Sequence, residues 1–414
     1  MHRRKTIGFV FYCLCWSMCF REGTAAEGWV ALDSGVKYQS IGTWDNGKLG
    51  KVITTELAAF MDGSTLEPIH YAGKLAAPKF AVRLYKVSYP SRIPEKGNAP
   101  TMATGLIAVP ITKAGPLPIV SYQHGTIFGR YECPSSPDNS METKLMLAQF
   151  GSQGYIVIAA DYFGLGDNQE PNSYLMREST EQACLDMLKA SQQVLRSLDV
   201  AHGPLLLNGW SQGGYSTLAF LRRLEMEGIS VQGASLSSSG GNMLLMVDRW
   251  MNNPQSTDAI WLPACATNLL HAAEHYWGMP GLTEEAIRPE YRAAAKEFFE
   301  FKINYSEYAS KLPRTTAEVF RKEFLEGGRF IQQPFWQALN KAEAYQWRCE
   351  TPLRIYYGDA DEAIPQSIPQ STAQAHQLLG ANTVAILNGP RADHRGNYVM
   401  SLLKIKPWFD ELVK

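Results

Sequence analysis

Short apolar runs typical of buried strands recur along the chain, and glycine- or proline-rich links bound several of them. Two such runs come early, and later ones alternate with stretches of helical pattern. The predicted strands are residues 82–87, 105–109, 117–122, 204–208, 231–236, 352–357 and 383–387. The chain before residue 80 has weak patterning, so residues 27–79 are treated as an N-terminal extension without an assigned role.

The pattern changes after the serine- and glycine-rich segment 237–241. Residues 242–348 have helical spacing with many aromatic side chains, and a strand pattern resumes only at residue 352. Aromatic residues at helical spacing mostly form the interior of their own unit, but a few should face a cleft. We interpret this segment as a helical cap or lid inserted between the sixth and seventh strands.

The strand at 204–208 runs directly into the pentapeptide G-x-S-x-G at residues 209–213, and a helical pattern follows. This context is typical of a nucleophile elbow, a sharp strand-to-helix turn that exposes a serine hydroxyl at the edge of a sheet. Gly209 and Gly213 leave room for the turn. Serine also occurs between glycines in ordinary turns, but the flanking strand and helix favour Ser211 as a nucleophile.

A serine hydroxyl needs a neighbouring base and a third group that orients the base. When the serine lies on an elbow, an acid and then a histidine follow it along the chain, each just beyond a strand. After strand 352–357, Asp361 is the predicted acid. Asp359 and Glu362 are its rivals, although Asp359 is better suited to capping the turn. His394, in the loop after strand 383–387, is the predicted base.

Acyl transfer also needs two N–H donors for the developing oxyanion. The backbone N–H of Gln212, the residue after the nucleophile, is one expected donor. The loop that follows strand 117–122 should supply the other, from Thr126 or, as second choice, from Gly125.

Other histidines offer alternatives. His271 and His275 form the pattern H-x-x-E-H, which in inverted zinc peptidases places two imidazoles on one helix face. No second helix with an acidic ligand is evident, so we predict no metal site. His376 falls in a helical pattern and is expected at the surface.

The motifs around Ser211, Asp361 and His394 resemble the α/β-hydrolase superfamily. Residues 154–167 also resemble the fourth strand of these enzymes and its glycine-rich exit loop, in which Asp161 is expected to have a structural role. Within the superfamily the chain is most similar to secretory lipases of the lipase A type. They share a Ser-Tyr-Gln run (121–123), an Asp-Tyr-Phe-Gly-Leu-Gly loop (161–166) and a large helical cap.

This resemblance covers residues 80–239 and 350–414. It implies an α/β-hydrolase fold, with a mostly parallel central sheet flanked by helices and a core made of residues 80–241 and 349–414. One departure concerns the oxyanion loop, since some of those lipases carry an acidic residue where this chain has His124, Gly125 and Thr126.

The N-terminus has the organisation of a signal peptide. A basic start is followed by an apolar stretch at 7–20 and by small residues at 24–26. The apolar stretch is too short to span a membrane, and no later run is long enough. We therefore predict removal of residues 1–26 and a secreted or periplasmic protein that contacts lipid interfaces at most transiently through its cap. A net charge of −1 without a basic block argues against a nucleic-acid partner.

Four of the seven cysteines lie beyond the signal peptide. An even number in an oxidising compartment is compatible with two disulfides. We predict that Cys265 pairs with Cys349 and Cys133 with Cys184. The alternative is that the four are buried free thiols that pack as small apolar residues.

These observations predict a secreted serine carboxylester hydrolase, an esterase or lipase, that acts on small-molecule esters or lipids with apolar acyl or aryl groups. It would act through an acyl-enzyme intermediate and would need no cofactor. The open alternatives are a serine peptidase or an acyltransferase of the same fold, and a binding protein whose site is inactive.

Overall fold

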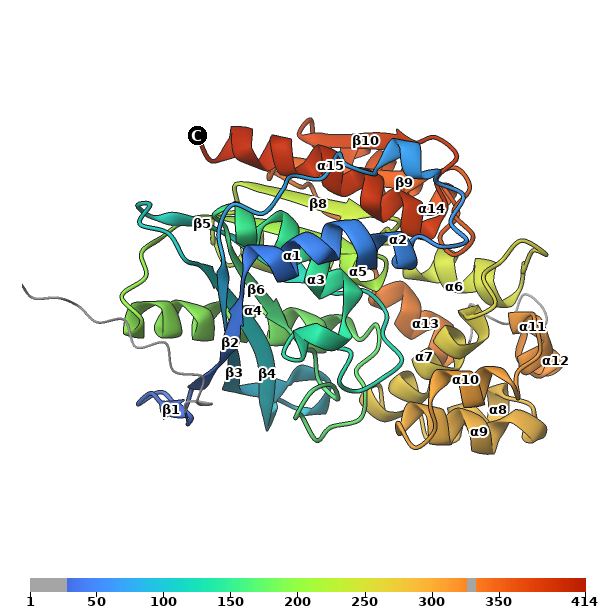
Figure 1. Cartoon of the computed structure of the whole chain (residues 1–414). Helices are drawn as coiled ribbons and strands as arrows, with labels where there is room; N and C mark the ends of the chain where they lie inside the picture. Colours follow the sequence, from blue (N-terminus) through green and yellow to red (C-terminus); the bar gives the residue numbers. More distant parts are fainter. Residues whose placement is uncertain (1–27, 326–332) are drawn as a thin grey trace, which may run out of the picture.

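The computed structural model describes residues 28–325 and 333–414, so the predicted signal peptide lies outside the described residues. A ten-stranded sheet runs through the molecule in the order β1-β2-β3-β4-β6-β5-β7-β8-β9-β10 (Figure 1). The strands are β1 (Val30–Ala31), β2 (Lys37–Trp44), β3 (Val82–Ile93), β4 (Ala99–Pro110), β5 (Leu117–Gln123), β6 (Ile156–Ala160), β7 (His202–Trp210), β8 (Gly233–Ser237), β9 (Leu353–Gly358) and β10 (Val384–Gly389). From β6 to β10 neighbouring strands pair in parallel, whereas the pairs from β1 to β4, and β4 with β6, are antiparallel.

Each predicted strand is present, and the structure adds β1 and β2 from the N-terminal extension. The pattern of β2 escaped prediction for a physical reason. Its pairing with β3 shifts register between Ser40 and Gly42, so the strict alternation of apolar and polar residues is interrupted. Its outer neighbour β1 is only two residues long, which leaves β2 close to the edge of the sheet.

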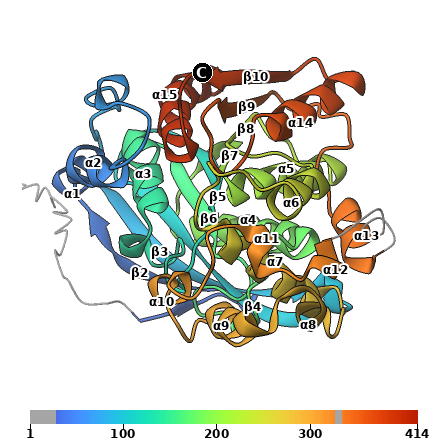
Figure 2. The ribbon, with the colours of Figure 1, turned by 90° about the vertical axis from the view of Figure 1, so that its right-hand side faces the viewer.

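Side chains that alternate along each strand build two apolar layers, one on each face of the sheet. In β5, Ile119 packs into one layer and Val120 into the other. The first layer is covered by α4 (Arg177–Ser197), α5 (Gln212–Met226) and α14 (Ser367–Leu378), and the second by α1 (Asn46–Lys51), α3 (Met141–Gln149) and α15 (His394–Leu412) (Figure 2). The sheet is therefore sandwiched between helices.

Between β8 and β9 the regular elements of the described chain are helices, joined by loops, apart from one isolated bridge, Ile287 to Phe320. Its helices gather at one side of the molecule (Figure 1). They are α6 (Met243–Met251), α7 (Leu262–Tyr276), α8 (Leu282–Ala286), α9 (Pro289–Phe299), α10 (Tyr305–Ala309), α11 (Thr316–Val319), α12 (Lys322–Leu325) and α13 (Pro334–Lys341). Aromatic side chains such as Phe298, Phe335 and Trp336 are buried among these helices and belong to the same apolar core as the first layer of the sheet.

Neither predicted disulfide forms. Cys133, Cys184, Cys265 and Cys349 are all free and buried. They lie in the apolar core, where burial raises the pKa of every one of these thiols, that of Cys265 to about 12. Each cysteine thus acts as a small apolar residue, which is the alternative that their even number alone could not exclude.

Within the described residues, no helix combines the length and the apolar character needed to cross a lipid bilayer.

Candidate active site

Ser211 occupies the turn between β7 and α5 with φ 58° and ψ −125°. This is a strained conformation for any residue with a side chain. The turn tolerates no Cβ on either side: one on Gly209 would lie 2.1 Å from the carbonyl oxygen of Gly213, and one on Gly213 would lie 1.9 Å from that of Gln123. The backbone thus has the geometry expected of a nucleophile elbow.

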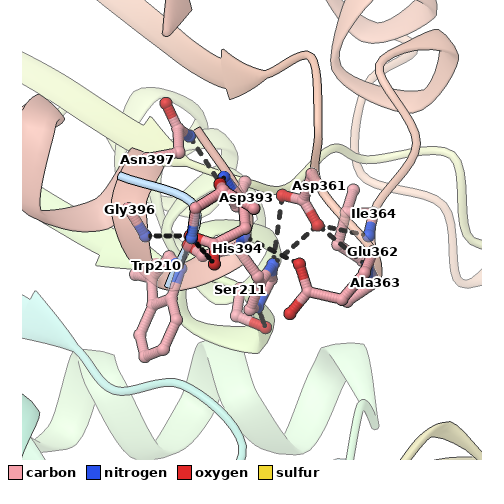
Figure 3. Close-up of polar contacts among 12 residues, drawn as sticks. Trp210, Ser211, Asp361, Glu362, Ala363, Ile364, Asp393, His394, Gly396 and Asn397 are labelled. Atoms are coloured by element: carbon pink, nitrogen blue, oxygen red, sulfur yellow. Dashed lines mark hydrogen bonds and ion pairs between the residues drawn. The ribbon is translucent and has the colours of Figure 1, made fainter. Parts of the chain in front are cut away.

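The structure brings Ser211, His394 and Asp361 together (Figure 3). The Oγ of Ser211 lies 2.9 Å from Nε2 of His394, and Nδ1 of the same ring lies 3.0 and 3.1 Å from the two carboxylate oxygens of Asp361. The three residues follow β7, β10 and β9, whose carboxyl ends meet at one edge of the parallel part of the sheet. All three side chains are almost completely removed from solvent.

The three carboxylates near this histidine have separate partners. Only Asp361 reaches the imidazole ring, and it also accepts two N–H bonds from the backbone that follows it. Glu362 accepts the backbone N–H of His394 at 3.0 Å, and Asp359 accepts the backbone N–H of Arg391. Asp359 and Glu362 therefore shape the loop that carries the histidine.

Electrostatic attraction between His394 and Asp361 shifts the pKa of both buried groups. Burial by itself lowers the pKa of the His394 imidazole, but the charge of Asp361 and its hydrogen bond outweigh burial and raise that pKa above its ordinary value. Burial likewise acts to raise the pKa of the Asp361 carboxyl, and the histidine and the N–H donors overcome this and lower it. The site is thus prepared to hold a proton on the imidazole.

Two backbone N–H groups beside Ser211 have no acceptor among the described residues: those of Gln212 and Thr126. Gln212 is the first residue of α5, where a helix leaves its N–H groups unpaired and carries a partial positive charge. The N–H of Gly125, the second choice for this role, already has an acceptor. It donates to a carboxyl oxygen of Glu142 at 2.8 Å, whereas among the described residues the N–H of Thr126 is free for this role.

Contacts of the His124 ring hold the loop that presents Thr126. The His124 ring stacks on Tyr162 with 4.1 Å between ring centroids, and its two nitrogens lie 2.8 and 3.0 Å from the carbonyl oxygens of Gly125 and Asp161. Burial lowers the pKa of this imidazole. The carboxylate of Asp161 accepts bonds from the backbone of Ser135 and from the hydroxyl of Thr104, which fits its expected structural role.

A cavity of about 530 Å³ opens beside Ser211 and His394. Its aromatic lining comes from separate parts of the chain. Trp210 precedes the serine, Trp261 and Tyr305 belong to the helical segment, and Phe60 ends α2 (Leu57–Phe60) of the N-terminal extension. The extension, for which the sequence indicated no role, thus lines the candidate site.

The same extension fastens the loop that carries His394. Asp393 accepts hydrogen bonds from the Ser64 hydroxyl at 2.7 Å and from the backbone N–H of Thr65 at 2.8 Å. The Thr65 hydroxyl in turn accepts the Asp393 N–H at 2.9 Å and donates to the carbonyl of Arg391 at 2.7 Å. We name this set, Ser64 and Thr65 with Arg391 and Asp393, the histidine-loop clamp. The one local signal for it is that Asp393 precedes α15 as its N-cap.

The other histidines lie elsewhere. His271 stacks on Phe299 and His275 packs against Tyr276. In the part of the chain that the structure describes, no group of three or more histidine, cysteine or acidic side chains could hold a metal ion. His376, expected at the surface, is buried and lies 2.8 Å from the carbonyl oxygen of Trp347.

No protein-family model matches the chain, and no curated protein matches it in sequence. Several solved structures are similar to it in fold. A candidate hydrolase from Legionella pneumophila aligns over 91% of this chain and 97% of its own, with TM-score 0.79 and 22% identity. The rice cell wall degrading esterase LipA from Xanthomonas oryzae aligns over 91% and 98%, with TM-score 0.76 and 18% identity. The chain has the α/β-hydrolase fold.

A more distant neighbour is Candida antarctica lipase A in its closed state, with TM-score 0.63, 14% identity and coverage of 91% of this chain and 83% of that chain. The α/β-hydrolase fold and the likeness to lipase A predicted from the sequence are therefore confirmed. At these identities the likeness speaks for the fold alone, so the function rests on the site.

Proposed function

We propose that this protein is a secreted serine carboxylester hydrolase with Ser211 as nucleophile, His394 as base and then acid, and Asp361 as the residue that orients the imidazole. One observation carries the proposal. A strained serine on a strand-to-helix turn makes a 2.9 Å contact with a histidine whose other nitrogen faces a buried carboxylate. This arrangement activates a hydroxyl that is otherwise a weak nucleophile.

In the first half of the reaction, Ser211 Oγ attacks the ester carbonyl while Nε2 of His394 takes its proton. The negative charge that develops on the carbonyl oxygen is stabilised by the unpaired N–H groups of Gln212 and Thr126. The C–O bond to the alcohol then breaks, His394 returns the proton to the departing alkoxide, and the acyl group stays on Ser211.

In the second half, a water molecule takes the place of the alcohol. His394 removes a proton from the water as it attacks the acyl carbon, and the same two N–H groups hold the second oxyanion. Collapse of this intermediate releases the acid and returns the proton to Ser211. Each step needs only groups of this chain and water.

We assign the remaining segments by their relation to this site. Residues 242–348 act as a cap, because Trp261 and Tyr305 from this segment line the cavity beside the serine. Residues 80–241 and 349–414 form the hydrolase core, and residues 1–26 direct export. Two structural neighbours are an esterase and a lipase, which supports ester hydrolysis.

The test is Ser211→Ala with p-nitrophenyl acetate as substrate and fluorophosphonate labelling as a second readout. Loss of a triad nucleophile costs on the order of 10⁶ in turnover, and the covalent adduct should disappear with it. Ser310→Ala, at an exposed serine of the helical segment, is the matched control and should keep both.

A Ser211→Ala protein that keeps a tenth of the wild-type rate would contradict the assignment. Aminoacyl p-nitroanilides, assayed beside the esters, test the peptidase alternative: a higher kcat/KM for amides than for esters would replace the proposal with that activity.

A further inference from the structure

Two spaces of very different size meet at Ser211. The larger is the cavity of about 530 Å³ already described, which His394 lines. The smaller has a volume of about 10 Å³, and Gln212 lines it. Ser211, Thr126 and Trp261 border both spaces. A substrate bound at the serine therefore has both spaces beside it.

The chemistry of the reaction indicates which cavity takes the alcohol of the ester and which takes the acyl group. The departing alkoxide must receive its proton from Nε2 of His394, so the alcohol lies on the side that this ring lines. The acyl group stays bonded to Ser211, with its carbonyl oxygen against the N–H groups of Gln212 and Thr126. With the alcohol on the His394 side and the oxygen at these N–H groups, the acyl chain is left to point into the other space, between Met246, Trp250 and Ile364. The small cavity takes the acyl group and the large one takes the alcohol.

The walls of the small cavity are fixed in place. The Trp250 indole N–H donates to the carbonyl oxygen of Ala363 at 2.8 Å, and the Tyr174 and Thr126 hydroxyls lie 3.0 Å apart. Trp250, Tyr174 and Met246 are all buried. A space of about 10 Å³ holds about one water-sized group, which corresponds to a methyl. A longer chain would have to displace packed side chains, and overpacking of this kind is costly.

The large cavity has the dimensions of a small-molecule site, since such sites span roughly 300–1,000 Å³. Aromatic rings of Phe60, Phe128, Trp210 and Tyr305 line it, and polar groups such as Asp62 and Arg395 stand among them. An alcohol with a flat, partly apolar body and some polar groups fits this lining.

Resting on the proposed function, we infer that the substrates are short-acyl esters, acetates above all, of a bulky and partly aromatic alcohol. This narrows the expectation drawn from the aromatic cap, which was an ester with an apolar acyl or aryl part. Aromatic side chains line both spaces, but Trp250 and Tyr174 close the acyl side down to room for about one carbon beyond the carbonyl, whereas the space on the alcohol side is large.

The first experiment varies the acyl chain with the leaving group held constant. For p-nitrophenyl acetate, butyrate and octanoate, the wild-type kcat/KM should fall at least 100-fold from acetate to octanoate. Trp250→Ala opens the acyl side and should raise the octanoate-to-acetate ratio at least tenfold. Because loss of a buried tryptophan can unfold a protein, Met246→Ala provides a second opening of the same wall, and the ratio is measured in variants with an unchanged circular dichroism spectrum.

The second experiment varies the alcohol with acetate held constant, using 1-naphthyl acetate and ethyl acetate. Phe60→Ala removes a wall of the large cavity and should lower the naphthyl-to-ethyl ratio of kcat/KM at least fivefold. The same variant should leave the octanoate-to-acetate ratio within twofold of wild type. This reciprocal pattern distinguishes a divided site from a general loss of packing.

Octanoate hydrolysed as well as acetate by the wild type, or an unchanged ratio in both folded acyl-side variants, would overturn the inference. In that case fluorophosphonate labelling of Ser211 together with ester turnover would still support the proposed function. Absence of both labelling and ester turnover would overturn the proposed function and the inference with it.

Discussion

Three acidic side chains surround the loop of His394, and each makes a different hydrogen bond. Asp361 meets the imidazole, Glu362 the backbone N–H of the histidine, and Asp359 the backbone of Arg391. Asp361→Asn should lower kcat by about 10⁴, because an amide that faces Nδ1 favours the wrong tautomer of the ring. Asp359→Asn and Glu362→Gln keep the shape of their side chains and should lose less than tenfold.

Steady-state kinetics with p-nitrophenyl acetate on all three variants checks this order. Equal losses at residues 359 and 361 would show that loop geometry, and not the contact with the ring, dominates.

Glu142, in α3, is a buried carboxyl in a different environment. Burial raises its pKa to about 8 even though the Gly125 N–H bond favours ionisation. The folded protein therefore holds a proton on this group at pH values where the unfolded chain, with a pKa near 4.5, has lost it. Since the folded state binds more protons, the stability that Glu142 contributes is complete below about pH 4.5 and is lost as pH rises through 8.

Glu142→Gln carries no such proton and should remove this part of the pH dependence. Urea midpoints at pH 5 and pH 9 test the expectation: the decline between them should be smaller in the variant than in the wild type. A decline of the same size in both proteins would mean that Glu142 ionises normally.

At the scale of elements, the N-terminal segment before β3 is joined to the beginning of α15 by the histidine-loop clamp. Thr65→Val keeps the shape of the side chain but removes both hydrogen bonds of its hydroxyl. Because His394 directly follows Asp393, a looser loop should lower kcat by about tenfold to 100-fold with a smaller change in KM. Thr65→Ser restores the hydroxyl and should restore kcat.

The matched control is Thr54→Val, since Thr54 is an exposed threonine of the same segment whose hydroxyl bonds only within its own helical turns. It should leave kcat unchanged. Failure of Thr65→Ser to recover the rate, or equal losses in both valine variants, would reduce the clamp to a contribution to stability.

For the molecule as a whole, the sequence predicted those structural features that are determined by residues close together along the chain. The strand before Ser211 and the glycines around it are local signals, and so are the acid and the histidine that follow later strands. The role of Thr65 was not predictable, because its partner lies 328 residues away. That the N–H of Gly125 already has an acceptor was not predictable either, because the acceptor is the side chain of Glu142 in α3. The prediction of two disulfides failed for the same reason, since the spacing of cysteines along the chain carries no information about which residues meet in the core.

The clamp and the Ser211–His394 contact also determine when activity can first arise during synthesis. The proposed nucleophile and its proposed base are 183 residues apart, and the clamp joins residues 329 apart, with the histidine at the start of α15. A ribosome that has translated the elbow, the cap and nine of the ten strands has therefore produced a chain without its base. Contacts of such long range also form late in folding. A cell that exports this chain unfolded would thus carry no hydrolytic activity on the side where the chain is made, and cleavage of esters would begin only after release.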